Sequence, residues 1–265
     1  MGRGTFRSQN KVGETMSFQT DSSSGTTFDP AVTFLSGSDT VSWDLGEGGG
    51  YNAGNGLSYT YPDSGTTKTV TLRTNKLSNL KQFQAQSDTI IGNLDMSGWD
   101  NFGGAFTVNN NPNLTGITHT YSSGVFTAYN VGLCDLTGNH DVSMFPNIGG
   151  VFYVNGNTSL TVITHTASTE TFSQYWAYSC NLTGNHDMSM LPGLGGDFRM
   201  YSNSSLTSIT HTSSTEVFSR YDAFSCNLTG NHDMSMLSGL GGWFQINSNS
   251  LLTGITHTSS TEVFT

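Results

Sequence analysis

Histidine has the most evident chemical potential in this sequence, because an imidazole can act as an acid, a base or a metal ligand near neutral pH. All seven histidines fall in two short motifs, Asn-His-Asp and Ile-Thr-His-Thr, and the copies of each motif are 46 residues apart. The first motif holds His140, His186 and His232, and the second holds His119, His165, His211 and His257.

Neither histidine motif predicts a metal site or a catalytic centre. If the repeats stack as successive coils, equivalent histidines lie two coils apart, roughly 10 Å. Zinc ligands must instead converge to within about 2.3 Å of one ion. A His beside an Asp, without a nucleophile at a fixed position, is not a catalytic triad. We therefore expect turn histidines copied with their repeat, and no catalytic residue, metal or cofactor.

The three cysteines, Cys134, Cys180 and Cys226, share the same spacing and are also expected roughly 10 Å apart. A disulfide needs Cα atoms within about 6.8 Å, so we predict buried free thiols. The acidic residues of the repeat lack the Gly-Gly-x-Gly-x-Asp spacing of calcium-binding β-rolls. Thr-His-Thr alternates with Asp-Met-Ser along the chain, which interrupts the regular threonine lattice that an ice-binding face needs.

The elements that must position these residues are coils of 23 residues. Phe or Tyr recurs at this period, at Phe83, Phe106, Tyr129, Phe152, Tyr175, Phe198, Tyr221 and Phe244. An apolar residue follows each aromatic two positions later, which is typical of a half-buried strand. Asn or Cys comes three residues after that, and we expect these side chains to form a buried structural ladder: Asn111, Cys134, Asn157, Cys180, Asn203, Cys226 and Asn249. Abundant Ser, Thr, Asn and Gly agree with an all-β chain.

This pattern resembles a leucine-rich repeat, and in particular the 23-residue subtype of BspA-like bacterial surface proteins. The resemblance is carried by Leu206-Thr-Ser-Ile209, Ala223-Phe224, Cys226 and Leu228-Thr229, and it covers about residues 77–265. His211-Thr212 departs from the subtype, which prefers an apolar residue and Pro there. The resemblance implies a right-handed parallel β solenoid of about eight coils over residues 76–265.

The N-terminal part divides into two predicted units. Residues 16–75 contain Trp43-Asp-Leu-Gly-Glu-Gly48 and Tyr59-Thr-Tyr61. These resemble a polycystic-kidney-disease (PKD) type β-sandwich, which would serve as a cap and spacer. Residues 1–15 are expected to form an N-terminal arm. At the other end, residues 262–265 stop before the next expected strand, so the last coil is a candidate for self-association.

Charge and hydropathy exclude several classes of partner. The formal net charge is −10, and residues 82–265 hold only Arg199 and Arg220 as basic residues. A phosphate backbone would be repelled by that region, so nucleic acid is not an expected partner. No apolar run is long enough for a transmembrane helix, so membrane insertion is not expected. The N-terminus, Met1-Gly-Arg-Gly-Thr-Phe-Arg7, lacks the apolar stretch of a secretory signal.

A binding face is predicted from what varies between coils. Positions beside the buried aromatics should point to solvent. Their residue types change from coil to coil, whereas the residues that flank them are nearly identical between repeats. The predicted ligand-binding residues are Tyr153, Gln174, Trp176, Tyr178, Asp197, Arg199, Tyr201, Arg220, Asp222, Trp243 and Gln245. Aromatic residues and Arg are enriched at interfaces. The alternative is plain scaffold, with aromatics favoured by strand propensity, cross-strand ion pairs Asp197–Arg220 and Arg199–Asp222, and Phe224 turned inward.

The sequence therefore predicts a non-catalytic surface recognition protein that binds a host glycan or protein. A β spacer followed by a variable face looks like a bacteriophage receptor-binding or tail-fibre protein, or a bacterial adhesin. Either protein would act on a virion, or outside the cell at the cell surface. No cofactor is expected. The alternatives are a self-assembling structural, filament or virion decoration protein, and an ice-binding solenoid.

Overall fold

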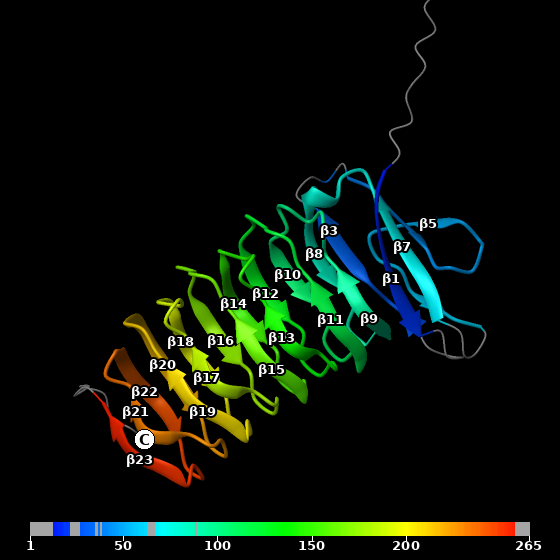
Figure 1. The fold of residues 1–265 in the computed structure, drawn as a ribbon. Helices are drawn as coiled ribbons and strands as arrows, with labels where there is room; N and C mark the ends of the chain where they lie inside the picture. Colours follow the sequence, from blue (N-terminus) through cyan, green and yellow to red (C-terminus); the bar gives the residue numbers. More distant parts are fainter. Residues whose placement is uncertain are drawn as a thin grey trace, which may run out of the picture.

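The computed structural model describes residues 13–21, 27–34, 37, 39–62, 67–87 and 89–257. Within these residues the protein is all-β, and its one helical element is the short 3-10 helix η1 (Leu77–Asn79). The architecture is a solenoid of about seven turns of stacked parallel strands, preceded by antiparallel strands (Figure 1). The all-β class and the tandem-repeat solenoid are thereby confirmed.

One face of the solenoid, here called the continuous sheet, has nine strands in the order β22-β20-β18-β16-β14-β12-β10-β8-β3. Its parallel strands are β8 (Leu80–Gln84), β10 (Gly104–Thr107), β12 (Phe126–Asn130), β14 (Ile148–Tyr153), β16 (Phe172–Trp176), β18 (Leu194–Arg199), β20 (Ser214–Asp222) and β22 (Leu237–Gln245). Seven steps of 23 residues lead from Phe83 in β8 to Phe244 in β22.

The opposite face, here called the segmented face, consists of strand pairs separated by breaks. Its strands are β9 (Ile90–Asp95), β11 (Asn113–Thr118), β13 (Thr137–Asp141), β15 (Ser159–Thr164), β17 (Thr183–Asp187), β19 (Ser205–Thr210), β21 (Thr229–Asp233) and β23 (Leu251–Thr256). The parallel pairs are β9–β11, β13–β15, β17–β19 and β21–β23. Consecutive pairs are not joined by a continuous backbone ladder.

The predicted 23-residue register is confirmed in the core. Each aromatic of the periodic row pairs with the next, from Phe83↔Phe106 to Tyr221↔Phe244. Neighbouring rings stack with centroids 4.9–6.1 Å apart. All of these rings are fully buried except Phe244 in the last strand. Offset stacking of this kind adds to the free energy that burial of the rings supplies.

The Asn and Cys side chains of the ladder are buried as predicted, but they form different hydrogen bonds. Asn203 Nδ2 donates to the carbonyls of Ala177 and Met200, at 2.9 and 2.6 Å, while its Oδ1 accepts the Leu182 N–H at 3.2 Å. Cys180 Sγ makes only donor contacts, the shorter being 3.3 Å to Val154 O. An amide both donates and accepts, whereas a thiol is a weak donor.

This difference coincides with the breaks in the segmented face. In every strand pair the second coil carries Asn, whose Oδ1 accepts an N–H at the start of the first strand: Ile90, Leu136, Leu182 and Leu228. Each break lies where the following coil carries Cys134, Cys180 or Cys226. The three cysteines are free.

The N-terminal strands continue both faces of the solenoid. They are β1 (Glu14–Asp21), β2 (Thr27–Phe28), β3 (Ala31–Phe34), β4 (Val41–Asp44), β5 (Tyr51–Ala53), β6 (Tyr59–Thr60) and β7 (Thr67–Thr74). β1 pairs antiparallel with β9 and β7, and β3 pairs antiparallel with β8. Phe18 of β1 packs on Phe83 at 6.1 Å, so the cap and the solenoid share one core. Of the predicted arm, residues 1–12 lie outside the described residues, as do residues 258–265.

Candidate recognition face

The continuous sheet brings the predicted binding residues into lateral register. Tyr153, Trp176, Arg199, Asp222 and Gln245 are successive cross-strand partners. A second row runs beside them through Gln174, Asp197, Arg220 and Trp243. Residues two apart on a strand share a face, so the two rows form one surface, here called the row face.

Aromatic rings of the row face stack on one another along the solenoid. The rings of Tyr153 and Trp176 are 4.1 Å apart and 16° from parallel. The Arg199 guanidinium lies 4.3 Å from the Trp176 ring centre, a cation–π contact. Because β14 and β18 flank β16 on opposite sides, Tyr153 and Arg199 cover opposite faces of the Trp176 ring.

A second stack lies just beyond the strand ends. Tyr178 and Tyr201 are 4.5 Å apart and 8° from parallel, and Tyr201 and Phe224 are 4.6 Å apart and 4° from parallel. Phe224 is half-buried in this stack, so the alternative in which it turns inward is wrong. Tyr201, in the middle of this stack, has both ring faces covered.

The ion pairs of the row face run along strands rather than across them. Arg199 donates from Nε and Nη2 to the two carboxylate oxygens of Asp197, at 2.7 and 2.5 Å. Arg220 Nε donates to Asp222 Oδ2 at 2.6 Å. The expected cross-strand pairing of these four residues is therefore wrong. Each Arg instead reaches the Asp two positions away on its own strand face, while the Arg199 guanidinium lies over the Trp176 ring.

Exposure differs strongly within the row face. Trp243 is 51% exposed, whereas Asp222 is fully buried and most of the other predicted residues are half-buried. Burial raises the pKa of Asp222, and its hydrogen bond with Arg220 acts in the opposite direction. Asp222 Oδ1 and Trp176 Nε1 are buried without a hydrogen-bond partner. Several polar side chains of the row face therefore bind one another, and Trp243 is its most accessible aromatic residue.

The structure also assembles a cluster that the sequence prediction missed. The Tyr221 hydroxyl lies 2.9 Å from His211 Nε2 and 2.9 Å from His232 Nε2. Two further clusters have the same geometry, with distances of 2.8–3.0 Å: His119–Tyr129–His140 and His165–Tyr175–His186. The prediction of turn histidines is wrong for His140, His186 and His232, which lie in strands β13, β17 and β21, and the imidazoles of all six residues reach the tyrosine hydroxyls in the core. The missed signal is the periodic row itself, where Tyr replaces Phe only in alternate coils and follows the 46-residue period of the histidines.

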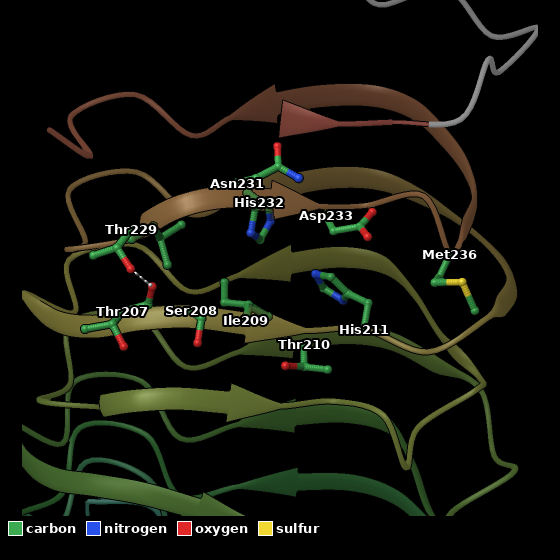
Figure 2. Close-up of a pocket in the computed structure, with 11 residues that line it drawn as sticks. Thr207, Ser208, Ile209, Thr210, His211, Thr229, Asn231, His232, Asp233 and Met236 are labelled. Carbon is green, nitrogen blue, oxygen red and sulfur yellow. Dashed lines mark hydrogen bonds between the residues drawn. The ribbon is translucent and has the colours of Figure 1, made fainter. Parts of the chain in front are cut away.

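Each cluster lies at a break of the segmented face. At the break between β19 and β21, His211 and His232 line a cavity of about 250 Å³ together with polar residues such as Asn231 and apolar residues such as Ile209 and Met236 (Figure 2). The Thr229 hydroxyl donates to Thr207 O at 3.5 Å at one end of this cavity.

The buried groups are held in their neutral forms. Burial lowers the pKa of His140, His186 and His232 to about 4 and that of His211 to about 3. Burial raises the pKa of the three tyrosines well above its ordinary value. The cysteine pKa values rise to about 11 or 12 for the same reason, so these thiols are poor nucleophiles.

The donor set does not fit a metal ion. A metal-bound imidazole normally donates its second ring N–H to an acceptor, and Nδ1 of His119, His165 and His211 has no partner. Within the described ranges, no three His, Cys, Asp or Glu side chains converge on a point that could hold a metal. Nor does that part of the chain contain a helix with the length and apolar character of a membrane span. Searches of family models, curated proteins and solved structures give no match to this chain.

Proposed function

We propose that this is a non-catalytic recognition protein that binds a host surface ligand through the row face. The observation that carries the proposal is the contrast between the two faces. The strand sequence Thr-Gly-Asn-His-Asp is identical in β13, β17 and β21, whereas the partners along the row face change from Tyr153 to Trp176, Arg199, Asp222 and Gln245. A scaffold alone does not require such divergence.

The stacking geometry bears on the ligand class. A sugar ring packs on a free aromatic face, and both faces of Trp176 are occupied by Tyr153 and Arg199. The row face therefore offers ring edges, hydroxyls and Arg–Asp pairs, which suit the binding of a protein ligand. Trp243 has Arg220 on one side, at 6.0 Å, and a glycan would be held there if a glycan is the ligand.

The biological setting is proposed from the resemblances. Coils similar to BspA-like leucine-rich repeats, behind an N-terminal segment similar to a PKD-type sandwich, suit a phage receptor-binding or tail-fibre protein, or a bacterial adhesin. Such a protein acts at the surface of a virion or cell. An ice-binding role is less favoured, because breaks and aspartates interrupt the segmented face.

The test is a binding screen on glycan arrays and on surface proteins of candidate hosts. For Trp243→Ala we expect at least a tenfold loss of affinity, since truncation of an aromatic hot-spot residue costs about 2 kcal/mol or more. Tyr121→Ala is the matched control, because Tyr121 is 55% exposed and lies off the row face. Equal binding by wild type and by a Trp243→Ala, Arg220→Ala double variant would reject the row face as the binding surface.

A second candidate function is self-association through the last coil. Among the described strands, β22 and β23 are the last of the two faces, and they pair with β20 and β21. Met234, Leu240, Phe244, Ile255 and His257 line an apolar cavity of about 290 Å³ at this end.

A further inference from the structure

The three His–Tyr–His clusters bridge the breaks of the segmented face. In each cluster the Tyr belongs to the continuous sheet, one His follows the last strand of a pair, and the other His lies on the first strand of the next pair. At the β19–β21 break, the strand starts are joined by Asn227 N–H to Leu206 O, at 3.0 Å, and by Thr229 Oγ1 to Thr207 O. Beyond these bonds, Tyr221 and its two histidines connect the diverging strands.

Proton counting shows what each cluster requires. A tyrosine hydroxyl has one hydrogen, so it can donate to one imidazole and must accept an N–H from the other. In the neutral cluster, both bonds form only if one imidazole carries its proton on Nε2 and the other on Nδ1. A further proton on the accepting imidazole removes its lone pair and breaks the bond from the hydroxyl. A further proton on the other imidazole leaves a charge in the core.

No carboxylate of the described residues forms a salt bridge with a cluster imidazole. The titratable groups that act on the imidazoles are the partner histidine, histidines of neighbouring clusters, and the Asp that follows His140, His186 and His232. A cysteine thiol lies near each tyrosine. The aspartates Asp141, Asp187 and Asp233 are exposed, and each accepts the N–H of the Ser two positions later at 2.9 Å. Arg220 and Asp222 belong to the opposite surface of β20.

We propose that the three clusters make the solenoid an acid-sensitive device, in which protonation of the imidazoles below about pH 5 separates the strand pairs at the breaks. The direction follows from linkage. Because the folded-state pKa values lie near 4 or lower, the unfolded chain binds more protons below its ordinary histidine pKa of about 6.5. Stability is then complete above about pH 6.5 and falls as the pH drops toward 4.

The chain supplies its own apolar replacement for a cluster. At the positions 23 residues away, Phe152 and Phe198 stand in place of Tyr175, Ile163 and Ile209 in place of His186, and Val142 and Met188 in place of His165. A variant that carries this apolar set at all three clusters replaces each side chain with one that the repeat already holds at the equivalent position. It also removes every titratable side chain of the clusters. Its substitutions are Tyr→Phe at 129, 175 and 221, His→Ile at 140, 186 and 232, and His→Met at 119, 165 and 211.

The experiment follows near-ultraviolet circular dichroism and light scattering from pH 8 to pH 3. Wild type should lose its tertiary signal with a midpoint between about pH 4 and 6, and the apolar variant should shift that midpoint down by at least one pH unit. A control with Asp95 changed to Asn should keep the wild-type midpoint, because Asp95 is exposed, accepts the Ser97 N–H at 2.8 Å and follows Leu94 rather than a cluster histidine. An unchanged midpoint in the apolar variant would overturn the proposal, as would a shift produced by the Asp control.

A second measurement is independent of that variant's folding. The six cluster imidazoles of the wild-type protein can be followed by heteronuclear NMR as the pH falls. We expect them to remain neutral until the fold is lost and to charge together with the loss of tertiary structure. Individual titration near pH 6.5 in an intact fold would contradict the proposal. The proposal does not depend on the row face or its ligand.

Discussion

One side chain per coil sets much of the local hydrogen bonding. Asn203 connects two coils through two donated bonds and one accepted bond, whereas Cys180 supplies only thiol donors. The same position in the repeat therefore carries two different structural roles. Spacing alone placed both residue types in one ladder, and only their contacts distinguish them.

Replacing Asn203 with Ala should cost much more than replacing Cys180 with Ala. The first change leaves Leu182 N–H and two carbonyls buried without partners, which should lower the free energy of unfolding by about 3–5 kcal/mol. The second removes a weak donor and a small volume, at about 1–2 kcal/mol. Urea denaturation of both variants at pH 7 measures the two costs. Similar values would mean that the amide bonds do not hold the coils together.

Strand geometry on the continuous sheet depends on glycines at register shifts. Gly196 has φ +63° and lies where β18 shifts register against β20. A Cβ there would stand 2.1 Å from Ser173 O. Gly184, in β17 of the segmented face, has a similar φ of +67° but open space around the Cβ position. A comparison of Ala substitutions at these two glycines therefore separates the cost of a positive φ from the cost of a steric clash.

Gly184→Ala should reduce stability by about 1 kcal/mol, the cost of a left-handed Ala. Gly196→Ala should be several times worse, because the backbone of β16 must also move. Thermal unfolding of the two variants gives the comparison. A Gly196→Ala protein as stable as Gly184→Ala would show that β16 and β18 can separate freely, which would also weaken the case for a rigid row face.

The arrangement of the two ends limits how copies of the protein can associate. β1 and β3 cover the first strands of both faces, whereas β22 and β23 are the last strands of the two faces in the described part of the chain. An association through this end joins two equivalent surfaces, and a two-fold axis between them closes the assembly as a dimer.

If self-association occurs, multi-angle light scattering should find no species larger than twice the 28.4-kDa chain, and electron microscopy should show no filaments. A charge introduced at the edge, Gln245→Lys, should return a dimer to monomer. Asn109→Lys, in the segment between β10 and β11 and far from this end, is the control. Filaments of the wild-type protein would contradict this closed geometry.

Sequence alone determined the all-β class, the 23-residue register, the buried aromatic row and the Asn/Cys ladder. These features repeat within one coil, so each is visible as a period in residue type. The tertiary structure decided what depends on contacts between different motifs. His211 and His232 belong to separate motifs 21 residues apart, and they meet only because adjacent coils stack around Tyr221. Likewise, the stacked faces of Trp176 and the partner of Arg199 follow from side-chain orientation, which periodicity does not specify.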